Sequence, residues 1–76
     1  MKELVETIVK ELVEEKDQVE IEENRNDGEV NIIIHVAESD KGRVIGVRGN
    51  IINSIRTIAR SAAIKENVKV NIKIWE

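Results

Sequence analysis

The stretch Gly42-Arg43-Val44-Ile45-Gly46-Val47-Arg48-Gly49-Asn50-Ile51-Ile52 decides the fold predicted for this chain. It places three glycines within eight residues, and isoleucines recur at a spacing of three from Ile52 onward. This pattern predicts a short helix, a tight turn over residues 46–49 and a second, longer helix. The start of such a helix can hold an anion, because unpaired N–H donors and the helix dipole both point at it.

The charges are divided unevenly along the 76 residues. The net charge is −3, but residues 1–40 carry −9 and residues 41–76 carry +6. The glycine-rich stretch lies in the basic half, which favours a nucleic-acid partner in spite of the acidic total. There is no cysteine, so neither a disulfide nor a thiolate metal site is available.

Residues 2–16 are predicted to form an amphipathic helix. Two adjacent rows at a spacing of four make one apolar stripe: Leu4, Ile8 and Leu12, and Val5, Val9 and Val13. A coiled-coil seam is the alternative interpretation, but the segment is too short for the three or four heptads that it requires. The stripe is therefore expected to face a core.

Alternating apolar and polar residues predict strands over Val19–Glu22 and Val30–Ala37. The turn-forming residues 24–28 between them predict an antiparallel hairpin. In the second strand, one set of side chains is expected to face the core: Val30, Ile32, Ile34 and Val36. The other set is expected on the outer face: Asn31, Ile33 and His35.

The remaining elements follow the same reasoning. Ser39 or Asp40 is expected to cap a short helix over about residues 40–46, and a longer helix is expected over residues 50–63. The inner face predicted for that longer helix consists of Ile51, Ile52, Ile55, Ile58, Ala59 and Ala62. Residues 68–74 alternate and predict a third strand. The predicted fold is a single α+β domain over residues 1–76, with a three-stranded mixed sheet, three helices on one face and the order α-β-β-α-α-β.

The central stretch resembles a known signature. Val44-Ile45-Gly46-Val47-Arg48-Gly49 followed by Ile52 and Ile55 looks like the VIGxxGxxIxxI motif of KH RNA-binding domains, and the element order resembles their type II, or prokaryotic, arrangement. Residues 36–46 and Ile55-Arg56-Thr57 are similar to the KhpA family of small bacterial KH proteins. One departure is that the family often has a basic residue directly after the first glycine, where this chain has Val47 and then Arg48.

The resemblance implies that the loop clamps about four nucleotides of single-stranded RNA. Gly46 and Gly49 would let a nucleotide backbone approach, and Arg48 with backbone N–H groups near Gly49 and Asn50 would hold phosphates. Further charge is expected from Lys41, Arg43 and Arg56. An apolar floor for the bases is expected from the two helices and the second strand, with Val44, Ile45 and Ile52 as its residues. Whether Val47 or Arg48 faces the phosphate stays open.

The resemblance also implies a role in the cytoplasm as an RNA chaperone or post-transcriptional regulator, paired with itself or with another KH-containing protein. The alternative is a protein-interaction module in which RNA binding is vestigial and the glycines only form a turn. On the outer sheet face, Ile33, His35 and Trp75 form either a self-association patch or three unrelated positions. No enzymatic activity, metal site or cofactor is predicted, because the only histidine lies on a strand and the glycine spacing matches neither a dinucleotide fingerprint nor a P-loop.

Overall fold

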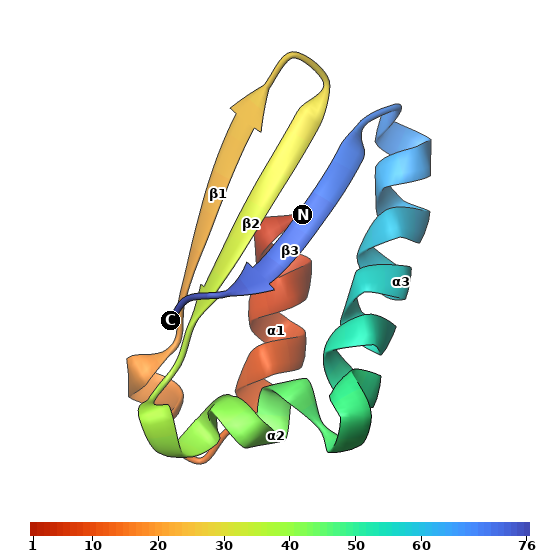
Figure 1. Cartoon of the computed structure of the whole chain (residues 1–76). Helices are drawn as coiled ribbons and strands as arrows, with labels where there is room; N and C mark the ends of the chain where they lie inside the picture. The colour runs from red at the N-terminus through yellow and green to blue at the C-terminus, as the bar shows by residue number, and fades with distance from the viewer.

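The computed structural model describes residues 1–76 and shows a three-stranded sheet with the helices gathered on one face (Figure 1). The elements are α1 (Lys2–Leu12), β1 (Glu20–Asn26), β2 (Glu29–His35), α2 (Lys41–Ile45), α3 (Asn50–Glu66) and β3 (Lys69–Ile74), with single 3-10 turns η1 (Lys16–Gln18), η2 (Glu38–Asp40) and η3 (Val47–Gly49). The predicted α+β class and element order are confirmed. None of the helices has the length and apolar character needed to cross a membrane.

The sheet has the order β1-β2-β3 and is mixed, as predicted. β1 and β2 pair antiparallel, whereas β2 and β3 pair parallel. The parallel pairing requires a crossover connection, and α2 and α3 supply it. Ile33 lies opposite Glu22 on one side and Lys73 on the other. Because β3 comes last in the strand order, it forms one edge of the sheet, and it lies beside α3 (Figure 1).

The core lies between the helices and the inner face of the sheet. Its buried apolar residues are Val5, Val9, Val13, Ile21, Val30, Ile32, Ile34, Val44, Ile52, Ile55, Ala59, Ala63, Val70 and Ile72. The predicted inner face of α3 was partly wrong, because Ile58 is 46% exposed and Ala63 is buried where Ala62 is only half-buried. The helix is thus turned slightly about its axis relative to the face that the isoleucine spacing indicates.

The first helix is shorter than predicted and ends at Leu12. Val13 is already extended, and the chain then makes the turn η1. The cause is a contact that is distant in sequence: the carboxylate of Asp40 accepts hydrogen bonds from the backbone N–H groups of Glu14 (3.1 Å) and Glu15 (3.0 Å). The expected cap of α2 by the side chain of Ser39 or Asp40 is therefore wrong, because no side chain caps this helix.

The hairpin between β1 and β2 is tighter than predicted. Residues 24–26 belong to β1, and the turn consists of Asp27 and Gly28 alone, since Asn26 already pairs with Glu29. Both turn residues have positive φ, at 45° and 78°. This is the two-residue type I′ geometry that Asp-Gly favours, and its twist matches that of the flanking strands.

Candidate nucleic-acid interface

The loop Gly46-Val47-Arg48-Gly49, called the GxxG loop below, has a backbone that needs glycine at its first position. Gly46 has φ 77° and ψ 176°, a region essentially restricted to glycine. A Cβ atom placed there would lie 2.6 Å from Cγ1 of Ile51. Arg48 and Gly49 also have positive φ, at 56° and 76°. Backbone strain and close packing thus coincide in the loop that joins α2 to α3.

The tip of the loop presents one apolar and one cationic side chain to solvent. Val47 is 78% exposed, and Arg48 is exposed with no carboxylate oxygen within 4.0 Å. No side chain caps the start of α3. However, the N–H of Gly49 donates to the carbonyl of Gly46, and that of Asn50 donates to the carbonyl of Val47. These two donors, which the sequence assigned to phosphate, already have partners inside the loop.

An open groove of about 390 Å³ lies beside the two helices. Its helical wall consists of Ile45, Ile52 and Arg56, three of the residues predicted for the site. Its other wall is formed by the last part of the chain: Lys73, Ile74 and Glu76. The prediction that the second strand would form the floor was wrong, because β3 is the edge strand next to α3 and occupies that place. Only the strand order reveals this, and no local pattern in the sequence gives it.

The apolar residues predicted for the floor differ in what they can contact. Val44 has no exposed surface and belongs to the core, so it cannot touch a ligand. Ile52 lines the groove but is only 6% exposed, whereas Ile45 is 37% exposed. Ile45 is therefore the main apolar surface that a base could meet on the helical side.

Three of the predicted cations have intramolecular partners. Arg43 pairs with the carboxylates of Glu14 and Asp40, and the Lys41 ammonium lies 2.8 Å from Glu38. The guanidinium of Arg56 donates through Nε and Nη2 to the backbone carbonyl of Ile72, at 3.1 and 3.0 Å. Carboxylates of the acidic half thus offset part of the charge beside the groove, and Arg56 ties α3 to β3.

The carboxylate of Asp40 anchors this corner of the fold. It is 1% exposed, and the backbone N–H groups of Glu15 and Glu14 lower its pKa, with smaller contributions from the charges of Arg43 and Lys16. The ionised side chain holds the chain just after α1 against the start of α2. The GxxG loop follows α2 directly, so this anchor also sets the position of the loop.

A GxxG loop between two helices that pack on a mixed three-stranded sheet is the arrangement of a type II KH domain. The family model described as "KhpA/KhpB, KH domain" matches residues 2–74, and the chain belongs to this family.

The chain is similar to several curated proteins named "RNA-binding protein KhpA". That of Clostridium acetobutylicum is 42% identical, over 97% of this chain and 99% of its own length. That of Chlamydia trachomatis is 38% identical over 100% and 97%, and that of Borreliella burgdorferi is 41% identical over 97% and 90%. No solved structure gave a significant match.

Proposed function

We propose that this protein binds single-stranded RNA at the GxxG loop and its groove, and that it acts as an RNA chaperone or post-transcriptional regulator. The observation that carries the proposal is Arg48, an exposed cation without a carboxylate partner at the tip of the loop. The open groove is lined by Ile45 and Ile52, which flank the loop in sequence, and it has apolar surface and no aromatic lining. The names of the curated relatives, which are RNA-binding proteins, support the same ligand class.

Each part of the site has a role in this proposal. Gly46 and Gly49 let the sugar–phosphate backbone approach the chain, and Arg48 contacts phosphate, while Val47 packs against the ribose. Ile45 meets the bases. Lys73 adds a positive charge on the opposite wall, and the carboxylate of Glu76, on the same wall, offsets part of that charge. Because stacking on an aromatic side chain is worth about 1–3 kcal/mol per base, a groove without one is expected to bind weakly.

The test is a fluorescence-anisotropy titration with labelled RNA at two salt concentrations. We expect four-nucleotide single strands to bind, and the logarithm of the affinity to fall with the logarithm of salt by about 0.7 per phosphate contacted. A stable hairpin that holds the same four nucleotides in its stem should bind less well, because its base edges are paired. An absence of binding at low salt, or equal binding of the hairpin, would contradict the proposal.

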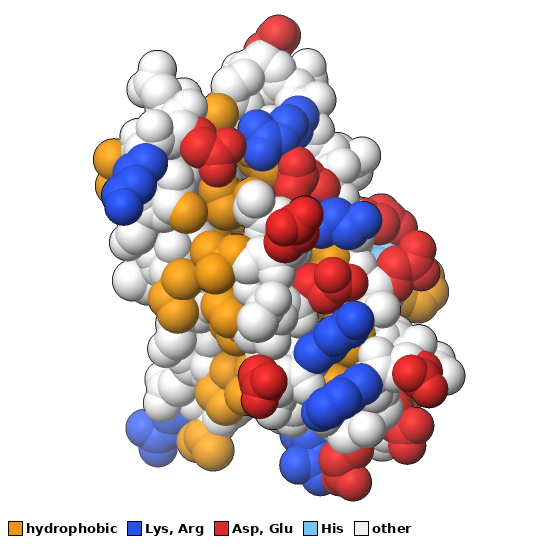
Figure 2. All heavy atoms as spheres, turned by 180° about the vertical axis from the view of Figure 1, so that it is seen from behind, with side chains coloured by type: hydrophobic (Ala, Val, Ile, Leu, Met, Phe, Trp, Pro, Cys, Tyr) orange, Lys and Arg blue, Asp and Glu red, His pale blue; other side chains and the backbone are white.

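We also propose that the chain pairs with a second copy or with another KH protein through its helical layer. Support comes from a band of apolar side chains that runs along this layer beside a charged region (Figure 2). Leu4 of α1 and Ile58 of α3 are 37% and 46% exposed, respectively, although both are large and apolar. Sedimentation of the parent and of Ile58→Asp at rising concentration tests this. We expect the parent to dimerise and the variant not to, and identical monomeric behaviour would refute the pairing.

A further inference from the structure

The only aromatic residue other than histidine lies on the outer face of the sheet, beside the groove. Trp75 follows β3, and its backbone N–H donates to the carbonyl of Ile34 at 2.9 Å, which continues the parallel pairing. Its ring stacks on His35, with 5.3 Å between the ring centroids and 30° between the planes. Trp75 remains 57% exposed. The indole is thus held in place while more than half of its surface is available.

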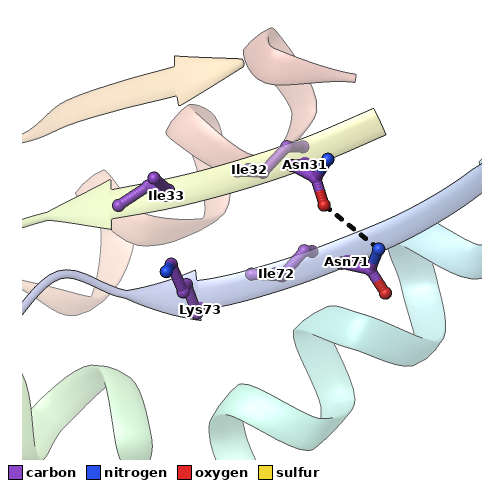
Figure 3. A pocket seen from close by; sticks show the side chains of 6 residues that line it. All are labelled: Asn31, Ile32, Ile33, Asn71, Ile72 and Lys73. Carbon is purple, nitrogen blue, oxygen red and sulfur yellow. Dashed lines mark hydrogen bonds between the residues drawn. The ribbon is translucent and has the colours of Figure 1, made fainter. Parts of the chain in front are cut away.

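One residue connects this face to the groove. Lys73 lines the groove, and it also lines a hollow of about 220 Å³ on the outer face of β2 and β3. Figure 3 shows Ile33, Asn31, Asn71 and Lys73 on the near side of the two strands, with Ile32 and Ile72 behind them. Lys73 forms none of the ion pairs of the structure, so no carboxylate oxygen lies within 4.0 Å of its ammonium group. Its ammonium group is therefore free to meet a ligand that passes from one hollow to the other.

Charge favours a polyanion along β3 and not along β1. The alternation of strands puts Lys69, Lys73 and Trp75 on the outer side of β3. The same alternation puts Glu20 and Glu22 on the outer side of β1. Between them, the amide of Asn71 donates to Asn31 (3.1 Å) and to Glu29 (3.2 Å). Lys69 and Lys73 thus make the β3 edge of the outer face more positive than its β1 edge, with Glu29 of β2 opposite Lys69.

We propose that the outer face of β3 is a second single-stranded RNA site that continues the groove. A strand leaving the groove passes Lys73, which contacts a phosphate, and an unpaired base stacks on Trp75, whose ring His35 holds. This inference rests on the proposed function and extends it from about four nucleotides to a longer strand. Stacking of one base on an aromatic ring corresponds to about tenfold in affinity.

The single tryptophan is itself the probe. We titrate the full chain and Trp75→Leu with oligoadenylates of four and ten nucleotides, following intrinsic fluorescence for the parent and anisotropy for both. We expect the ten-nucleotide strand alone to quench Trp75. We also expect the variant to bind that strand about tenfold more weakly while binding the short strand unchanged. Ile64→Ala is the control, because Ile64 is also large, apolar and exposed (78%) but lies at the far end of α3.

The outcomes separate the two proposals. If both strands bind parent and Trp75→Leu equally and fluorescence does not change, this site is refuted while the groove stands. If neither strand binds the parent, both proposals fall. Sedimentation of the parent and of Trp75→Leu without RNA completes the test. If Trp75→Leu changes the sedimentation of the chain but not its RNA affinity, the outer sheet face binds another protein chain, and the RNA site is refuted as well. Since Trp75 is exposed and near the end of the described chain, the variant is expected to fold.

Discussion

At the scale of single residues, Gly46 is the position that tolerates least. Its φ of 77° and ψ of 176° belong to a region that other residues reach at a cost of about 1–3 kcal/mol. Gly42 lies one turn earlier, in α2, where a Cβ atom would meet nothing within 4 Å. Replacement by alanine is therefore expected to destabilise the fold at Gly46 but not at Gly42.

We predict that Gly46→Ala lowers the free energy of unfolding by about 1–3 kcal/mol, through backbone strain and the contact with Ile51. Gly42→Ala, the matched control, should leave it unchanged or raise it by up to about 1 kcal/mol, because alanine favours the helix. Urea unfolding of the two variants measures this. Equal effects at both positions would contradict the loop geometry described above.

Arg48 combines strain with exposure. Its φ of 56° is left-handed, which costs a side chain such as arginine about 1 kcal/mol, whereas asparagine adopts it readily. We predict that Arg48→Asn leaves the free energy of unfolding unchanged or raises it by up to about 1 kcal/mol, while RNA affinity falls. Thermal unfolding and anisotropy on the same samples would show it. A variant that loses stability and keeps its affinity would mean that Arg48 serves the fold and not the ligand.

At the scale of elements, Asp40 joins α1, α2 and the loop that follows. Its folded-state pKa lies below the ordinary value of 3.8 because it accepts the backbone N–H groups of Glu15 and Glu14. Its contribution to stability is therefore complete above about pH 4 and is lost as the pH falls through the lower folded-state value. An amide in its place would turn its own NH₂ group toward one of these donors.

We predict that Asp40→Asn has a lower urea midpoint than the parent at pH 7, and that the difference narrows as the pH falls below about 4. Asp17→Asn, which removes an exposed carboxylate, controls for the change in net charge. A difference that stays constant from pH 7 to pH 3 would show that the ionised carboxylate is not what holds this corner together.

Some features of these elements could be predicted from the sequence, and others could not. Hydrophobic periodicity predicted both long helices and all three strands, and the Gly46–Gly49 spacing predicted the loop, because these patterns are local. The end of α1 at Leu12 was missed because a carboxylate 28 residues later determines it. The role of Arg56 was missed for a similar reason, since its acceptor is a backbone carbonyl of β3. Contacts between segments distant in sequence leave no local pattern.

At the scale of the whole molecule, the division of charge predicted from the sequence becomes a division in space only in part. Arg43 and Lys41 from the basic half pair with acidic side chains, which leaves Arg48 at the loop and Arg56 and Lys73 in the groove without a carboxylate partner. The groove therefore has few cations that are free of a carboxylate partner. Its affinity is expected to depend steeply on each of them, and only modestly on the net charge of the chain.

The most direct test of the RNA clamp compares two double variants of equal charge change. Val47→Asp with Arg48→Asp places two carboxylates on the loop. Ile64→Asp with Lys65→Asp makes the same change at the other end of α3, where Ile64 is exposed to the same extent, 78%, as Val47.

Circular dichroism first establishes that both variants are folded. In anisotropy titrations with four-nucleotide RNA, we predict that the loop variant loses binding while the distal variant stays within a few-fold of the parent. Equal loss in both would mean that only overall charge matters, and binding by the loop variant as tight as that of the parent would show that the GxxG loop is not the RNA clamp.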